Sequence, residues 1–191
     1  MPNFSHCHTH SWFSFQDGVA SPAGLAQQAK SLKMDAGFVT DHGNLFAAVP
    51  FYEECKKYDL KCGIGVEGYI SKVRDSVDVK GREQLGHIIL IAKNQVGYSN
   101  LCRIVSDSYK NFYYKPRMSL DMVEKNSEGL ICSTACVHGL IARELYYKKD
   151  GVLNEENNVK EAIALIIRLK RIFKDDLYLE LMDTGVDGQQ A

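Results

Sequence analysis

The sequence predicts an α/β fold in which short buried strands alternate with amphipathic helices. Short apolar runs are separated by segments with helical spacing, and polar side chains repeatedly stand at the ends of these runs. The length of 191 residues suits one domain. Hydrophobic residues make up 45% of the chain and charged residues 25%, which is ordinary globular composition and argues against disorder.

Charge and cysteine usage exclude several classes of protein. The formal net charge of −1 does not favour a domain that wraps nucleic acid by bulk electrostatics. No apolar run approaches the ~18 residues that a membrane-spanning helix needs, and the N-terminus does not resemble a secretory signal. The chain has six cysteines and no Cys-x-x-Cys pair. We therefore expect a reduced, cytoplasmic protein without a membrane partner.

The expected elements follow from periodicity and from capping residues. The expected strands, which we take to be parallel, span residues 3–9, 36–40, 61–70, 87–92, 129–133 and 177–182. The expected helices span residues 22–34, 44–58, 97–109, 119–125, 140–147 and 155–173. Residues 71–84 are expected to form an exposed loop, and residues 111–118 an aromatic and basic loop.

The first chemical signal is a cluster of ionisable residues at expected strand ends. His8 and His10 share one face of a strand, a spacing that suits one metal ion or two adjacent ones. Asp41 and His42 directly follow an apolar run, and Asp41 can orient an imidazole from behind. Glu67 ends another apolar run, where a carboxylate is costly to bury without a cation. The alternative for each is a packed or solvated side chain.

Three further residues carry weaker signals. Asp17 lies in a sequence typical of a turn. Cys136 follows an apolar run, but most buried cysteines only pack. His87 fits least well, because it opens its expected strand, whereas the active sites of (β/α) barrels lie where strands end.

Several motifs resemble those of the PHP (polymerase and histidinol phosphatase) domain family. Residues Phe4–Ser11, Ser14–Gly18 and Thr40–Leu45 look like its opening motifs. The resemblance is closer to the PHP domains of bacterial DNA polymerase III α subunits. It covers essentially the whole chain in order, and its further stretches are Gly63–Ile70, His87–Leu101, Tyr114–Arg117, Gly129–Cys136 and Tyr178–Leu181.

The resemblance implies a distorted (β/α)₇ barrel of the TIM type, with up to three divalent metal ions held by nine ligands. Carried over by position, the implied metal ligands are His8, His10, Asp17, His42, Glu67, His87 and Cys136. His6 and His138 fall outside this pattern. The last two ligands of the family, in an Asn-Asp-x-His segment, have no counterpart here. We therefore expect residues 1–191 to form a PHP domain that stops before its last strand, within a longer polymerase chain, and to be weakly active or inactive as an isolated fragment.

A mixed nitrogen, oxygen and sulfur ligand set suits Zn²⁺ or Mn²⁺ better than Mg²⁺. Such ions promote phosphoester hydrolysis by water, and the implied catalytic residues are Asp41, His42 and Glu67. Asp41 is expected to orient the ring of His42 from behind. The family association is with 3′–5′ exonuclease activity on DNA ends, single-stranded or in a primer-template. The implied partners are DNA, the rest of the polymerase chain and a proofreading exonuclease subunit, in the cytoplasm of a bacterial or phage-infected cell.

The loop that contains Tyr114, Lys115 and Arg117 interleaves aromatic and basic residues, which suits the binding of unpaired bases and phosphates. A packed loop with solvated basic ends is the alternative. Two other functions also stay open. One is a stand-alone PHP phosphatase acting on a small phosphate monoester. The other is a non-catalytic, metal-stabilised scaffold of the polymerase.

Overall fold

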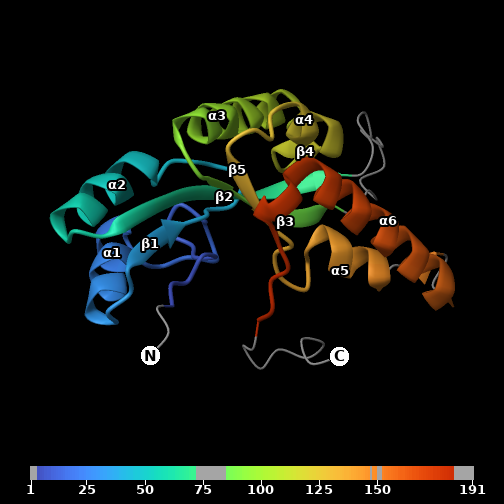
Figure 1. The fold of residues 1–191 in the computed structure, drawn as a ribbon, viewed down its shortest axis with the longest axis horizontal. Helices are drawn as coiled ribbons and strands as arrows, with labels where there is room; N and C mark the ends of the chain where they lie inside the picture. The colour runs from blue at the N-terminus through green and yellow to red at the C-terminus, as the bar shows by residue number, and fades with distance from the viewer. Residues whose placement is uncertain (1–3, 72–84, 147, 150–151, 183–191) are drawn as a thin grey trace.

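The computed structural model describes residues 4–71, 85–146, 148–149 and 152–182. Its centre is a six-stranded sheet with the order β1-β2-β3-β5-β8, in which β4 pairs with the end of β2 on the edge opposite β3. The strands of this sheet are β1 (Ala36–Val39), β2 (Lys61–Ser71), β3 (Gly86–Ala92), β4 (Arg117–Ser119), β5 (Leu130–Ser133) and β8 (Leu177–Tyr178). The sheet curves but does not close into a complete barrel (Figure 1).

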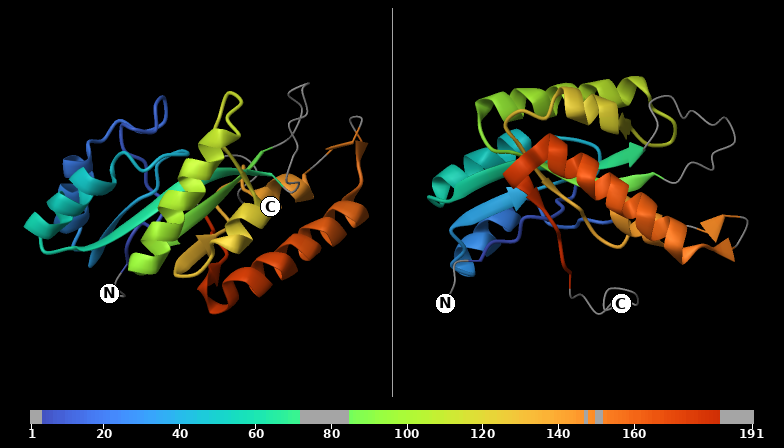
Figure 2. Two further views of the ribbon diagram at one scale, coloured as in Figure 1. Left: turned by 90° about the horizontal axis from the view of Figure 1, so that it is seen from above. Right: turned by 45° about the vertical axis from the view of Figure 1, so that its right-hand side comes forward.

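Helices cover one face of this sheet (Figure 2). They are α1 (Pro22–Ser31), α2 (Ala48–Lys57), α3 (Gln95–Lys110), α4 (Leu120–Lys125), α5 (Leu140–Leu145) and α6 (Glu155–Phe173). A small hairpin of β6 (Lys148–Lys149) and β7 (Val152–Leu153) precedes α6, and a 3₁₀ turn, Lys174–Asp176, follows it. None of the helices in the described ranges is long and apolar enough to span a membrane.

The expectation of a wholly parallel sheet is wrong at β3. This strand pairs antiparallel with both β2 and β5, whereas the pairs β1–β2, β2–β4 and β5–β8 are parallel. Residues 72–84, the expected exposed loop between β2 and β3, lie outside the described part of the chain. Antiparallel neighbours need no helical crossover between them, whereas parallel neighbours do.

Other differences lie at the ends of elements. Residues 4–10 form no regular strand, although the backbone N–H of Thr40 donates to the carbonyl of Thr9 at 2.8 Å. The expected loop at residues 111–118 includes the short strand β4, and the expected strand at residues 177–182 is regular only over β8. The helix expected from residue 44 begins at Ala48, because the side chain of Asn44 instead accepts from the N–H of Phe46 in a turn.

Alternation along β2 and β3 separates the two faces of the sheet. Val66, Ile70, Ile88 and Leu90 point outward into the main core beneath α3–α6. The side chains between them, which include Glu67 and His87, point to the inner face. The inner face is therefore free to carry the polar site.

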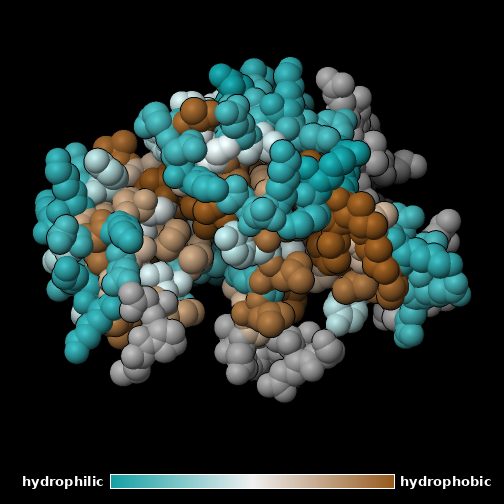
Figure 3. Space-filling model, viewed as in Figure 1, coloured by the Kyte–Doolittle hydropathy of each residue, from teal (hydrophilic) through white to brown (hydrophobic). Residues whose placement is uncertain are grey.

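Capping side chains start most of the helices. Ser21, Asn94, Ser119 and Asn154 accept hydrogen bonds from backbone N–H groups in the first turns of α1, α3, α4 and α6 respectively. Pro22 stands at the first position of α1, as expected. Along α6, Ile163 and Ile167 are half exposed or more, and apolar surface gathers over this helix (Figure 3).

Candidate metal centre

Glu67 lies at the centre of a cluster of histidines on the inner face of the sheet. Its side chain is almost completely buried, at 1% exposure of the residue. One carboxylate oxygen, Oε2, lies 3.0 Å from Nε2 of His10, 3.0 Å from Nδ1 of His42 and 3.4 Å from Nε2 of His8. The other oxygen, Oε1, lies 2.7 Å from Nδ1 of His87. Four imidazoles from separate parts of the chain thus surround one carboxylate.

Backbone hydrogen bonds beyond the end of β1 place His42 opposite Glu67. The N–H of Glu67 donates to the carbonyl of Asp41 at 3.0 Å, and the N–H of Gly43 donates to the carbonyl of Glu67 at 2.9 Å. Gly43 has a φ of +61°, a left-handed conformation that glycine adopts without strain. The turn that follows the apolar strand therefore carries the imidazole to the inner face.

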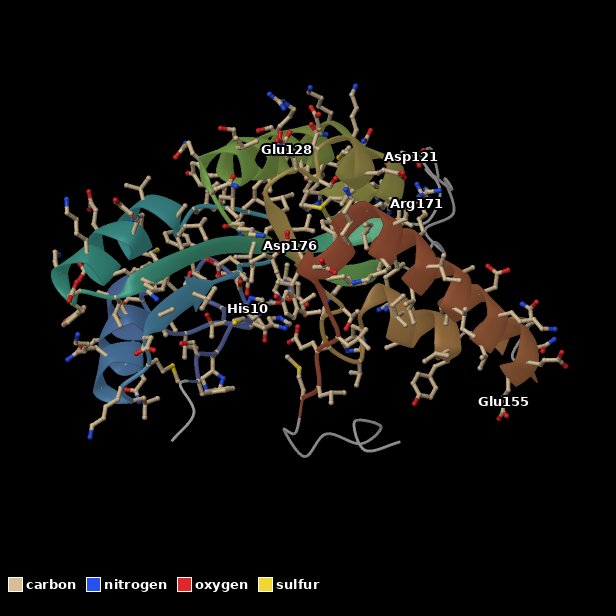
Figure 4. All side chains as sticks on the ribbon, in the orientation of Figure 1. His10, Asp121, Glu128, Glu155, Arg171 and Asp176 are labelled. Atoms are coloured by element: carbon tan, nitrogen blue, oxygen red, sulfur yellow. The ribbon has the colours of Figure 1, made fainter. Side chains whose placement is uncertain are left out.

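The N-terminal segment supplies His8 and His10 without forming a strand. The two Nε2 atoms lie 3.2 Å apart, and the ring centroids are 5.2 Å apart. The expectation that the His-x-His pair shares one face is confirmed, although the regular strand from which it was argued is absent. His10 lies on the side of the sheet away from α3 and α4 (Figure 4).

The reversal of β3 explains why His87 belongs to the cluster. Because β3 runs antiparallel to β2, its first residues lie where β2 ends, and His87 pairs with Tyr69. Its N–H donates to the carbonyl of His138 at 2.8 Å. His87, near the start of an antiparallel strand, therefore lies at the same end of the sheet as the residues at the C-terminal ends of the parallel strands.

Asp17 joins the site from an exposed turn. Its Oδ2 lies 2.7 Å from Nε2 of His42, whose ring stacks on that of His10 at a centroid distance of 4.3 Å. The described residues contain three groups whose ligand atoms converge closely enough to hold a metal ion: His8 with His10 and Glu67, His10 with Asp17 and His42, and His42 with Glu67 and His87.

The donor atoms fit a divalent metal ion. Nδ1 of His42 is buried and has no hydrogen-bond partner, which is costly unless a ligand uses its lone pair. Tetrahedral ligands that bind a metal ion at 2.0–2.1 Å lie about 3.3 Å from one another, close to the 3.2 Å between Nε2 of His8 and Nε2 of His10. A divalent cation would satisfy the unpaired nitrogen of His42 and the buried carboxylate of Glu67.

The electrostatics of the cluster favour an ionised Glu67. Burial alone would raise the pKa of its carboxyl, but hydrogen bonds with His10, His8 and His87 lower that pKa well below the ordinary range. Burial would lower the pKa of His8, yet hydrogen bonds with Glu180 and Glu67 raise it to about 10. Burial lowers the pKa of His42, against the attraction of Glu67, and so favours the neutral ring that binds metal ions.

The structure places Asp41 behind His10, and not behind the ring of His42 as the sequence suggested. The buried carboxylate accepts from the N–H and the hydroxyl of Ser11 and from the hydroxyl of Ser14, each at 2.7 Å. The Ser14 oxygen in turn lies 2.9 Å from Nδ1 of His10. Asp41 therefore acts on an imidazole through a serine. His42, the next residue, instead directs its ring toward Glu67 and Asp17.

Glu180 is a residue of the site that the sequence analysis missed. Its Oε1 lies 2.7 Å from Nδ1 of His8, and its Oε2 accepts from the Ser133 hydroxyl at 2.6 Å. Its own N–H donates to Oγ1 of Thr134 at 3.0 Å. The available signal was a glutamate between two leucines inside the last expected strand, residues 177–182.

Cys136 lies at the edge of the cluster and belongs to none of the three convergent groups among the described residues. Burial would raise the pKa of its thiol, but a hydrogen bond with the side chain of His87 lowers it. The N–H of His138 also points at the sulfur, 3.4 Å away. The structure therefore brings Cys136 beside one proposed ligand, His87. His6 packs against Phe4 and stays outside the described groups.

The three residues expected to bind substrate differ in position. The ammonium of Lys115 lies 4.2 Å from the ring centroid of Tyr69, whose ring stacks on His42 at 5.7 Å. Tyr114 is 84% exposed. The guanidinium of Arg117 lies over the ring of Tyr113 at 5.0 Å. Lys115 is thus one aromatic ring away from the cluster, while Tyr114 faces solvent.

Comparison with known proteins assigns the family. The sequence model of the PHP domain matches residues 6–184. The chain belongs to the PHP family. It is 42% identical over 191 residues to the DNA polymerase III subunit alpha of Borreliella burgdorferi, and 38% identical over 192 residues to that of Campylobacter jejuni. These matches cover 97% and 100% of this chain but only 16% of each relative.

The PHP fold is also supported by a solved structure. The crystal structure of a candidate metal-dependent phosphoesterase from Bifidobacterium adolescentis superposes with a TM-score of 0.50. It covers 97% of this chain and 79% of that protein, at 16% sequence identity. At this identity the likeness concerns the fold, an α/β architecture of the TIM-barrel type whose sheet in this chain is open.

Proposed function

We propose that this chain is a metal-dependent phosphoesterase domain of a bacterial DNA polymerase III α subunit, and that it hydrolyses phosphodiester bonds at DNA 3′ ends. The observation that carries the proposal is the buried carboxylate of Glu67 inside a ring of four imidazoles. In this proposal residues 1–191 belong to one PHP domain of a cytoplasmic polymerase. The rest of that chain, DNA and the proofreading exonuclease subunit are its partners.

The residues proposed to hold Zn²⁺ or Mn²⁺, up to three ions, are His8, His10, Asp17, His42, Glu67, His87 and Cys136. Their nitrogen, oxygen and sulfur donors suit these metals. Ions held there would lower the pKa of a water molecule and neutralise phosphate charge. The fold of the chain places the donor atoms, because the buried carboxylate of Glu67 faces one ring nitrogen of each of four histidines.

Other residues support the proposed chemistry by orientation. Asp41 holds His10 through Ser14, and Glu180 holds His8, so each of these rings keeps Nε2 directed toward Glu67. Of the three proposed catalytic residues, Glu67 and His42 lie in the cluster itself, and Asp41 is a positioning residue. Lys115, with Arg117 and Tyr114, is proposed to contact the phosphates and bases of the DNA end.

The test removes the paired imidazoles. We expect the double variant H8A/H10A to lose bound transition metal by elemental analysis. It should also lose hydrolysis of single-stranded DNA labelled at its 5′ end, with Mn²⁺ or Zn²⁺ supplied. The control is His6→Ala, in the same segment but outside the cluster, which should keep both properties. A small phosphate monoester, assayed in parallel, separates a phosphodiesterase from a monoester phosphatase.

Each result has a definite meaning. Metal binding without hydrolysis of either substrate would overturn the catalytic proposal in favour of a metal-stabilised scaffold. Hydrolysis of the monoester alone would overturn the choice of DNA as the substrate. Unchanged metal content in H8A/H10A would overturn the assignment of these two ligands.

A further inference from the structure

A basic pocket lies outside the metal centre, between the C-terminal half of α3 and the segment β4–α4. It has a volume of about 560 Å³, within the range of ligand pockets. Its polar lining includes Arg103, Lys110, Asn111, Ser119, Lys125 and Asn126. Two carboxylates, Asp107 and Asp121, also line it.

Both carboxylates already have cationic partners. Asp107 pairs with Lys110 at 2.6 Å, and Asp121 pairs with Arg168 of α6 at 2.5 Å. Arg103 and Lys125 make no ion pair with a carboxylate within the described ranges. The pocket therefore offers two cations whose charge is not consumed by a close salt bridge.

Neutral amides hold the guanidinium of Arg103 in place. Its Nη1 donates to Oδ1 of Asn100 at 3.0 Å and to Oδ1 of Asn126 at 3.5 Å, and both asparagines are buried. A guanidinium fixed by amides keeps its full charge and leaves other N–H groups to donate. Arginine in such a position is well suited to bind a phosphate through two hydrogen bonds.

An exposed aromatic segment joins this pocket to the metal centre. Asp121 of the pocket and His10 of the metal centre lie on opposite sides of the sheet (Figure 4). The chain between Asn111, which lines the pocket, and Lys115, which lies over Tyr69, is four residues long. It therefore spans at most about 14 Å.

Aromatic rings stand along this connection. Phe112 is 55% exposed and stacks with Tyr109 at a centroid distance of 6.0 Å, and Tyr114 is 84% exposed. Exposed rings between two groups of cations are the arrangement that single-stranded nucleic acids require, because bases stack while phosphates pair with cations.

We propose that the pocket binds backbone phosphates of a single strand whose end occupies the metal centre. The strand passes over Phe112 and Tyr114 at the edge of the sheet, and Arg103 and Lys125 pair with phosphates several nucleotides from the end. This proposal rests on the proposed function and deepens it. The proposal predicts that the protein binds single strands more tightly than mononucleotides, and that contacts outside the metal centre cause this difference.

The test uses the variant R103Q/K125Q and a fluorescein-labelled thymidine strand of twelve nucleotides with phosphorothioate linkages, followed by fluorescence anisotropy. The loss of two charge-assisted contacts predicts an affinity at least about tenfold lower. The slope of log affinity against log salt should fall by about 0.7 for each lost phosphate contact. The matched control is K30Q/K56Q, which removes two charges from exposed lysines of α1 and α2.

Two further variants guard against misfolding. Lys125→Gln changes an exposed side chain without an ion pair, and Arg103→Lys keeps the charge. The first should show about half of the loss in salt slope. The second should keep the salt slope, because the charge is retained, and should bind more weakly than the parent chain but more tightly than R103Q/K125Q, because lysine lacks the two-pronged hydrogen bonding of arginine. Thermal unfolding of each variant checks that the fold is retained.

The outcomes separate this inference from the proposed function. Strand binding that depends on Arg103 and Lys125 would support the pocket even if no hydrolysis occurred. Binding by R103Q/K125Q equal to that of K30Q/K56Q would overturn the pocket even if hydrolysis at the metal centre were demonstrated. Competition by thymidine 3′,5′-bisphosphate as effective as that by the strand would also overturn it, because a free nucleotide would then be the ligand.

Discussion

Orientation of the histidines depends on side chains behind them. His8 contacts Glu180, and His10 contacts Ser14, which itself donates to Asp41. In both rings Nδ1 makes the supporting contact while Nε2 faces Glu67. Partners of this kind fix the tautomer and the direction of a ligand, so their removal lowers metal affinity although they touch no metal.

We predict that Glu180→Gln weakens metal binding by about 10- to 100-fold, because the amide can no longer hold Nδ1–H of His8 with a charged acceptor. Isothermal titration with Zn²⁺ measures the change. Glu128→Gln, at an exposed glutamate on the far side of the sheet (Figure 4), should bind as the parent chain does. Equal affinities for the two variants would show that Glu180 is not a positioning residue.

Cys136 gives a second prediction for a single residue. If its thiolate is held in the site beside His87, chelation should increase the rate at which iodoacetamide alkylates it. Mass spectrometry of the labelled peptides follows Cys136 and, as the internal control, Cys102 on α3, whose rate should not change. Identical protection of Cys136 with and without chelator would mean that burial alone shields it.

The direction of β3 is the feature of a single element that matters most for the site. Because β3 runs antiparallel to β2, His87 lies beside the end of β2. The packing at the start of β3 is tight. A Cβ atom at Gly86 would lie 2.4 Å from Cα of Leu140, a backbone atom that cannot move aside easily. Glycine at this position therefore lets α5 pack closely against the start of β3.

We predict that Gly86→Ala lowers the free energy of unfolding by about 1–3 kcal/mol, the usual cost of overpacking. The shift of β3 should also displace His87 and weaken metal binding. Urea unfolding and metal titration measure the two effects. Gly24→Ala in the first turn of α1 is the control, because its Cβ would approach only a serine side chain oxygen at 3.3 Å. A neutral Gly86→Ala would contradict the packing argument.

Across the whole molecule, the metal centre joins parts of the chain that are distant in sequence. Glu67 on β2 gathers His8 and His10 from the N-terminal segment, His42 from the loop after β1 and His87 from β3. Glu180, beyond β8, contacts the same N-terminal segment. The site thereby links the segments beside β1 and β8, the two edge strands of a sheet that does not close by hydrogen bonds.

We predict that metal ions stabilise this arrangement as a whole. At a free Zn²⁺ concentration 100 times the dissociation constant, binding to the native state adds about 2.7 kcal/mol, and for a chain of this size that corresponds to a rise of about 5–11 °C in Tm. Differential scanning calorimetry with and without chelator measures it. The variant H8A/H10A should lose most of the rise, and an unchanged Tm in the parent chain would contradict the prediction.

Much of the site could be predicted from local sequence. Asp41-His42 and Glu67 each stand at the end of an apolar segment, where polar groups are costly to bury without a shared ligand, and the spacing of His8-x-His10 suits a metal ion. The structure brings these residues and His87 and Asp17 together. The strands and helices were also largely predictable, because burial on one face imposes a period of 2 or 3.6 on the sequence.

Only the tertiary structure decided which groups face one another. Pairing between distant segments sets the direction of β3 and the contact of Asp41 with Ser14. It also places Glu180 beside His8 and Cys136 at the edge of the histidine cluster. Periodicity records which face of an element is buried, but it carries no information on strand direction or on the partner across the sheet. The sequence by itself determined the kinds of ligand and the elements that carry them, whereas their assembly around Glu67 required the fold.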